Sequence, residues 1–154
     1  MSGFFNYFYC MTEYIKTFEL RWADVDANLH VMHSKYYEIG AHTRMSFLSE
    51  KGCTHDVMKE LKIGPILFRE ECVFKREINA GEMIHVNMLL TKCRRDGSRW
   101  SVRHELKKED GTIAALINAD LAWFDVIKRK LTIPAMAAAL IEETPKADDF
   151  KYTD

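Results

Sequence analysis

The sequence concentrates its reactive side chains between Asp24 and Tyr36. This segment reads D-V-D-A-N-L-H-V-M-H-S-K-Y and holds two carboxylates, an amide and two imidazoles. A carboxylate can attack a carbonyl carbon or take a proton from water, and an imidazole can move that proton. An amide can orient the attacking water. Such a set could carry out acyl transfer without a serine or cysteine nucleophile.

Each of these residues also has a simpler interpretation. Asp, Asn and His are common before helices as caps and turn formers, and His33-Ser34 would serve as such a cap. Asp24 is expected to cap the loop or to contact Arg21 or Arg44 rather than to react. The concentration of polar groups, more than any one of them, favours a catalytic interpretation.

The elements around this segment must position it. Residues 13–22 alternate partly between apolar and polar, which predicts a first strand. Ser34 to Lys51 reads as a helix, with Ser34 as N-cap and Gly52 as the glycine that follows the last turn. The apolar residues of this helix spread around its circumference, which predicts burial on most of its sides.

The second half of the chain predicts strands. Residues 66–78 and 83–93 alternate, and Asp96-Gly97 and Asp110-Gly111 are strong hairpin signals that lead into two further strands. A short helix over 135–142 follows, and the tail from Glu143 is expected to be loose. One strand, a long helix and an antiparallel meander predict an α+β fold in which a curved antiparallel sheet wraps around one central helix. Exposed sheet edges predict a homodimer or a dimer of dimers.

Bulk properties narrow the class of protein. The 154 residues predict one domain, with residues 1–11 as a candidate N-terminal extension and Met11 as an alternative start. A formal net charge of -1, from 22 basic and 23 acidic residues, argues against a nucleic-acid or membrane-surface module. The four cysteines form no C-x-x-C, and the N-terminus lacks the features of a signal peptide. We therefore expect free thiols and a cytoplasmic protein.

The segment from Asp24 to Tyr36, continued to Arg44, resembles the signature of the 4-hydroxybenzoyl-CoA thioesterase-like family of hotdog enzymes. That signature has Asp-x-Asp after the first strand, a Tyr on the central helix and an Arg eight residues later. The D-x-D-x-N-x-H form also resembles the acyl-ACP thioesterase branch. The resemblance implies a hotdog fold and hydrolysis of an acyl thioester, with CoA or acyl carrier protein as part of the substrate and no other cofactor.

The same resemblance assigns roles to residues. Asp26 would be the nucleophile or general base, Asn28 would orient water or the carboxylate, and His30 would assist proton transfer. His33 is the rival of His30, because the bacterial acyl-CoA thioesterase branch often has a histidine at that position. Amides at the helix start would hold the thioester oxygen; they belong to Ser34, Lys35 and Tyr36.

Other candidates and functions stay open. Glu70 lies on an apolar strand face, where it is either a second carboxylate near the acyl pocket or a salt-bridge partner. His104 is expected to be a packed histidine. No ligand spacing supports a metal site. A dehydratase or hydratase of acyl thioesters, and a non-catalytic module that binds acyl thioesters, are the alternative functions.

Overall fold

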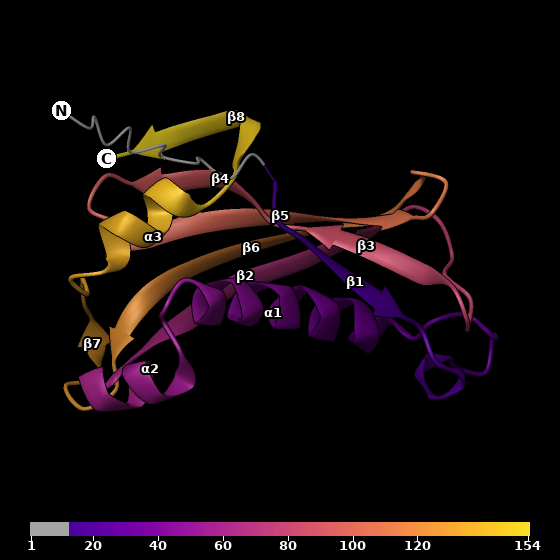
Figure 1. Ribbon diagram of the computed structural model, residues 1–154, viewed down its shortest axis with the longest axis horizontal. Helices are drawn as coiled ribbons and strands as arrows, with labels where there is room; N and C mark the ends of the chain where they lie inside the picture. Colours follow the sequence, from indigo (N-terminus) through magenta and orange to yellow (C-terminus); the bar gives the residue numbers. More distant parts are fainter. Residues whose placement is uncertain (1–12) are drawn as a thin grey trace, which may run out of the picture.

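The computed structural model describes residues 13–154, so the candidate extension and the alternative start lie outside the described residues (Figure 1). In chain order, the elements are β1 (Ile15–Glu19), the 3-10 helix η1 (Trp22–Asp24), α1 (His33–Glu50), α2 (His55–Leu61), β2 (Ile63–Phe74), β3 (Met83–Asn87), β4 (Leu89–Arg94), β5 (Arg99–Lys108), β6 (Ile113–Asp125), β7 (Lys130–Leu131), α3 (Ala137–Glu143) and β8 (Lys146–Thr153).

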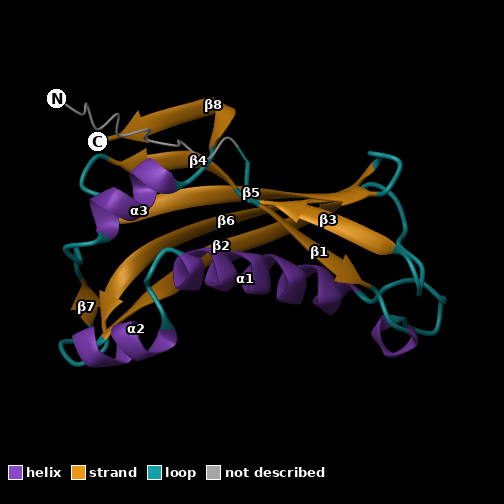
Figure 2. Cartoon of the chain, viewed as in Figure 1, coloured by secondary structure: helices purple, strands orange, loops and turns teal. Residues whose placement is uncertain are grey.

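One curved sheet holds the strands, and α1 lies along one of its faces (Figure 2). β2 pairs with β6 and β6 with β5, all antiparallel. The other edge of β5 pairs with β3 along one half and with β4 along the other. Beyond these, β1 continues the sheet next to β3. This arrangement confirms the predicted fold class of a curved antiparallel sheet over one long helix.

The two predicted hairpins are confirmed and join β4 to β5 and β5 to β6. Gly97 and Gly111 have φ of +74° and +85°, a conformation that glycine adopts without steric cost. Asp96 and Asp110 precede them, and each carboxylate accepts a hydrogen bond from the backbone N–H two residues later, at 2.9 Å and 2.8 Å. The turn residues therefore fix the register of the late strands.

The strand predicted over residues 83–93 is interrupted and forms β3 and β4. The break lies beside Asn87, whose side-chain oxygen accepts the backbone N–H of Glu105 at 2.7 Å. The carbonyl of Asn87 pairs with the ring of His104, Nδ1 to O 2.8 Å. Side chains thus replace the regular backbone pairing at this point. Residues 84–86 and 89–90 keep the same register along β5, and the register shifts only between Leu90 and Lys92.

The prediction that residues 143–154 form a loose tail is wrong. Residues 146–153 form β8, which lies parallel to β4. The reason is the free edge of β4, because β1 covers only β3. Ala147 of β8 is buried and Phe150 packs against the core, while the polar residues between them face outward. A sequence with two separated apolar residues does not reveal such an edge strand.

Helix α1 differs from its prediction in two respects. It begins at His33 with Met32 as N-cap, so Ser34 lies in the first turn and is not the cap. The backbone N–H of Met32 donates to the Asp24 carbonyl at 2.9 Å, which turns the chain into the helix earlier. The helix is also buried along one stripe instead of on most sides, because the sheet covers only one side of it. Gly52 follows the helix at φ +86°, as predicted.

A polar layer at the middle of α1 divides the core into two apolar clusters. Arg44 donates to Glu70 (2.8 Å) and lies 3.3 Å from Nε2 of His104. Burial lowers the pKa of His104 to about 3, so the ring is neutral. Its Nδ1–H donates to the Asn87 carbonyl and its Nε2 accepts from Arg44. His104 is thus packed in the core as predicted, and here it orients Arg44.

Two further findings bear on the sequence predictions. The cysteines in the described part of the chain, Cys53, Cys72 and Cys93, are free thiols. Within residues 13–154, none of the helices is long and apolar enough to cross a membrane.

Candidate active site

The segment between η1 and α1 folds into a tight loop that holds Asp26 and His30 opposite each other. Val25 pairs with Val31, and the backbone N–H of Asp26 donates to the His30 carbonyl at 2.9 Å. Leu29 closes the turn with φ of +65°. The Asp26 carboxylate accepts the backbone N–H of Asn28 at 2.8 Å. The second Asp26 oxygen has no partner among the described residues and is free to act.

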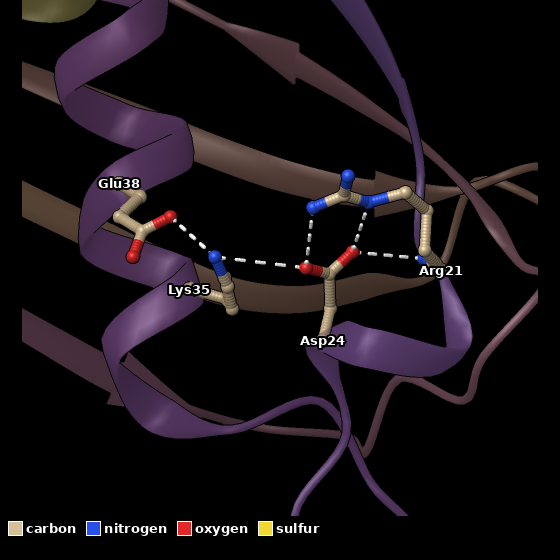
Figure 3. A network of polar contacts seen from close by, with 4 residues as sticks. All are labelled: Arg21, Asp24, Lys35 and Glu38. Atoms are coloured by element: carbon tan, nitrogen blue, oxygen red, sulfur yellow. Dashed lines mark hydrogen bonds and ion pairs between the residues drawn. The ribbon is translucent and has the colours of Figure 1, made fainter.

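Asp24 anchors the start of this loop (Figure 3). Its carboxylate accepts the backbone N–H of Arg21 at 2.9 Å and two guanidinium bonds at 3.2 Å and 3.1 Å. Lys35, from the first turns of α1, lies 3.6 Å away and pairs with Glu38. These bonds to Arg21 lower the pKa of Asp24 to about 2. Asp24 therefore contacts Arg21 as predicted, but not Arg44, and it ties the loop to the helix.

A surface groove of about 810 Å³ lies in front of the loop and brings four predicted site residues together. Asp26, His30 and His33 line it with carboxylate and imidazole groups, and Tyr36 adds a buried ring. Tyr36 packs edge-on against Phe74 of β2, with ring centroids 4.9 Å apart. Nε2 of His30 lies 3.8 Å from the Glu77 carboxylate. The groove combines a carboxylate with two proton carriers.

The start of α1 opens onto the same groove. Met32 provides no side-chain cap, and the N–H groups of His33 and Ser34 have no hydrogen-bond partner among the described residues. Unpaired N–H groups at a helix start carry partial positive charge and attract an anionic oxygen. This end of the helix can therefore stabilise charge that develops on a carbonyl oxygen.

The other predicted site residues lie elsewhere. The Asn28 side chain is exposed and outside the groove lining, and Lys35 faces Asp24 and Glu38 instead. Ser34 is exposed in the first turn of α1. Glu70 lies farther along β2 and pairs with Arg44 at 2.8 Å. Within residues 13–154, no three His, Cys, Asp or Glu side chains come together as a metal site would require.

The far wall of the groove comes from residues that sequence reasoning missed. They lie where β2 ends and where β5 turns into β6, and they are Lys75, Arg76, Glu77, Lys108, Asp110 and Thr112. The Asp110-Gly111 hairpin signal marked the turn itself. Only the pairing of β2 with β6 and of β6 with β5 shows that it lies beside the loop.

A curved antiparallel sheet wrapped over one long helix is the hotdog fold, and the candidate site lies at the start of that helix. The chain belongs to the thioesterase-like superfamily, whose family model matches residues 20–141. This match confirms the family and the class of enzyme, a thioester hydrolase, that the sequence predicted. β8 lies beyond the matched residues. No curated protein matches the chain in sequence.

Solved structures agree on the fold. A hypothetical protein from Staphylococcus aureus, in complex with CoA, has a TM-score of 0.79 and 18% identity over 86% of this chain and 84% of that chain. A 1,4-dihydroxy-2-naphthoyl-CoA thioesterase from Synechocystis has a TM-score of 0.72 and 16% identity over 82% and 96%. A putative oleoyl thioesterase from Lactobacillus plantarum has a TM-score of 0.77 and 10% identity over 92% of this chain and 52% of that one.

Proposed function

We propose that the chain hydrolyses an acyl thioester carried on CoA, with Asp26 as the reacting carboxylate. The observation that carries this proposal is the groove in which Asp26, His30 and His33 face the uncapped start of α1. The CoA complex of the Staphylococcus aureus protein supports CoA as the carrier. The two named thioesterases are described as acting on an aromatic acyl group and, for the putative one, on a fatty acyl group, so both classes belong in the substrate panel.

The groove suggests how the reaction runs. The thioester oxygen lies against the amides of His33 and Ser34, which stabilise the negative charge of the tetrahedral intermediate. Asp26 either takes a proton from water, which attacks the carbonyl carbon, or attacks directly to give an anhydride that water then opens. In both routes the C–S bond breaks, and the leaving thiolate takes a proton from His30 or His33. The products are the free acid and CoA.

Exposed cations at the rim suit the carrier. Lys75 and Arg76 follow β2 and are exposed beside the groove. Their charges would attract the phosphates of CoA, and salt would weaken that attraction. We expect KM to rise with ionic strength while kcat changes little, because the phosphates lie away from the reacting bond.

A free-thiol release assay over a panel of acyl-CoA thioesters tests the proposal. Asp26→Asn should lower kcat about 100-fold or more. Asp110→Asn is the matched control, because Asp110 lines the same groove and its carboxylate also accepts a backbone N–H at 2.8 Å. We expect the control to stay within about three-fold of wild type. Equal loss in both variants would show that turn geometry, and not Asp26 chemistry, is what matters.

The same panel separates the alternative functions. Hydration of an enoyl thioester without thiol release would identify a hydratase, and tight binding without turnover would identify a binding module. Single turnover in H2-18O tests the anhydride route, because label enters the Asp26 carboxylate only when water opens an anhydride at the Asp26 carbonyl. Comparison of His30→Gln with His33→Gln then assigns the proton donor.

We also propose that a second copy of the chain pairs with the outer edge of β2. Within the described residues β2 pairs only with β6, so its other edge is open over twelve residues. Leu67, Val73 and Phe74 expose apolar surface along this strand. Antiparallel pairing with the same strand of a second copy would satisfy the edge and bury these side chains.

Solution mass tests this pairing. Val73→Lys should shift the protein from dimer toward monomer in light scattering after size exclusion. Val126→Lys is the control, because both valines are 45% exposed and Val126 lies in the connection to β7. A wild-type monomer, or a dimer that tolerates Val73→Lys, would contradict the proposal.

A further inference from the structure

The end of the molecule away from the candidate active site is formed by α2 and a hairpin. Figure 1 shows α2 and β7 at this end, opposite the loop that follows β1. The chain leaves β6 at Asp125, turns through residues 126–129 and returns as β7, whose Lys130 pairs with Asp125. The backbone N–H of Val126 donates to the Lys62 carbonyl at 3.0 Å, so the hairpin lies directly against the end of α2.

Large apolar side chains of α2 and of the hairpin are exposed to solvent. Their exposed fractions reach 65% at Ile127, in the turn, and 49% at Leu61, in the last turn of α2. The others are Val126, Leu131 and Ile133. Apolar surface gains free energy when it leaves water, so a cluster of such side chains marks a contact surface for a partner.

Cations accompany these apolar side chains, and all of them are exposed: Lys59 and Lys62 at the end of α2, and Lys128, Arg129 and Lys130 at the hairpin. We call these cations and the five apolar residues the α2–β7 surface. The net charge of the whole chain, -1, argues against a protein that is basic throughout. Attraction to a charged surface acts over about 10 Å at 0.1 M salt, so the local charge of the α2–β7 surface decides what it attracts.

The turn of the hairpin is held in one conformation. The Asp125 carboxylate accepts the backbone N–H groups of Ile127 and Lys128 at 3.0 Å and 2.7 Å. Arg129 has φ of +55°, and its guanidinium carbon lies 5.3 Å from the centroid of the Phe124 ring. Asp125 is thus engaged inside the turn. A turn formed in advance loses little conformational freedom when Ile127 enters a partner.

We propose that the α2–β7 surface docks the protein on an anionic lipid bilayer. Lysine and arginine side chains attract anionic headgroups, and the apolar side chains among them enter the boundary between headgroups and acyl chains. The inference goes beyond the proposed function and does not depend on it. Because the groove lies at the other end of the molecule, docking leaves it open to substrate from solution.

Other partners match this surface less well. A second copy of the chain would set the same cations against one another, which costs free energy. Nucleic acid would pair with the cations but would leave Leu61 and Ile127 against phosphate and water, where their apolar surface gains nothing. The lipid interface is the partner that accepts both groups at once.

Co-sedimentation of the full chain with lipid vesicles tests the docking. Wild type should bind vesicles of about 30% phosphatidylserine in phosphatidylcholine, should bind pure phosphatidylcholine far more weakly, and should lose affinity as salt is added. Lys128→Gln combined with Lys130→Gln should weaken binding about 25-fold, because each cation near an anionic bilayer contributes about five-fold in affinity. Ile127→Ser should weaken it about ten-fold, since it removes the side chain that enters the bilayer.

Two controls make the same chemical changes elsewhere. Lys92→Gln combined with Lys151→Gln removes two exposed lysines that are neighbours across β4 and β8. Ile15→Ser removes an isoleucine of β1 that is 46% exposed. Both controls should bind within about three-fold of wild type, because these positions lie outside the α2–β7 surface.

Each outcome supports or overturns the docking. Wild type that does not bind phosphatidylserine vesicles, binds both lipids equally, or is weakened as much by the controls as by the hairpin variants overturns it. So does a loss of dimer in light scattering with Ile127→Ser, which would show that the surface is a contact between copies. Thiol release from a short acyl-CoA without vesicles is measured beside it. A protein that binds vesicles but hydrolyses no thioester refutes the proposed function alone.

Discussion

The bonds around Asp24 predict that Asp24→Asn lowers the stability of the protein in a pH-dependent way. In the wild type the buried carboxylate accepts three hydrogen bonds from Arg21 and lies 3.6 Å from Lys35. An amide offers one acceptor oxygen and turns an NH2 group toward the guanidinium. The variant therefore loses charge-assisted bonds and leaves the loop less firmly tied to α1.

The size of the effect follows from the pKa of Asp24. Its bonds with Arg21 lower that pKa from 3.8 to about 2, and one pKa unit corresponds to about 1.4 kcal/mol. The upper limit is therefore about 2.5 kcal/mol. The Arg21 side chain is 71% exposed, so water screens part of the attraction. We expect Asp24→Asn to cost about 1–2 kcal/mol of unfolding free energy at pH 7.

The direction of the Asp24 pKa shift determines how its contribution to stability changes with pH. A carboxyl whose folded pKa lies below its unfolded value stabilises the fold above the unfolded pKa. This stability is lost as the pH falls from about 4 through about 2, where the folded carboxyl also takes up its proton. The difference between wild type and Asp24→Asn should thus be full at pH 7 and nearly vanish at pH 2.

Urea unfolding at pH 7, 4, 3 and 2 measures this difference. Asp149→Asn is the control, because Asp149 also pairs with an arginine, Arg103, but its side chain is 68% exposed. We expect no measurable loss of stability in the control, because water screens an exposed ion pair. Hydrolysis should fall about ten-fold in Asp24→Asn, since Asp26 loses its fixed position. A loss of stability that is the same at pH 7 and pH 2, or as large in the control, would refute the reasoning.

Three further predictions concern the core, the last strand and a turn. Arg44→Met should lower the free energy of unfolding in urea by about 3 kcal/mol, because it leaves the Glu70 carboxylate without its partner. Adding Glu70→Leu should recover most of that loss; a double variant whose loss equals the sum of the two single losses would contradict this. Truncation after Thr144 should lower Tm by several degrees and promote aggregation, measured by calorimetry and light scattering, since it removes β8 and frees the edge of β4. Gly111→Ala should lower the free energy of unfolding by about 1 kcal/mol, because Gly111 has a positive φ and no atom lies within 4 Å of the new Cβ. Gly64 is equally open but lacks a positive φ, so Gly64→Ala should leave the free energy of unfolding unchanged.

Local signals in the sequence predicted much of the fold. Asp96-Gly97 and Asp110-Gly111 demand turns whatever surrounds them, so the meander could be predicted before any tertiary contact was known. The same holds for Gly52 after the long helix. The N-cap could not be located in this way, because Met32 has no capping side chain. Its place is set by the bond to the Asp24 carbonyl.

Features that depend on which strands pair could not be predicted from the sequence. β8 forms because β1 leaves the edge of β4 open, and no sequence pattern within residues 146–153 indicates that this edge is open. The loop between η1 and α1 was selected as the candidate site from residue types alone, yet the Asn28 side chain lies outside the groove. Asp26 and His30 both line the groove, whereas Asn28, which lies between them at the turn, does not, so proximity in sequence does not place all three side chains on one wall.

The polar layer at the middle of α1 is formed by residues that are far apart in the sequence. Arg44 meets Glu70 and His104, which lie 26 and 60 positions away in the chain, and the three separate the two apolar clusters. Because the layer satisfies its own charges, it can divide the interior without binding substrate. Residues before it, at the groove, would then govern the rate of hydrolysis.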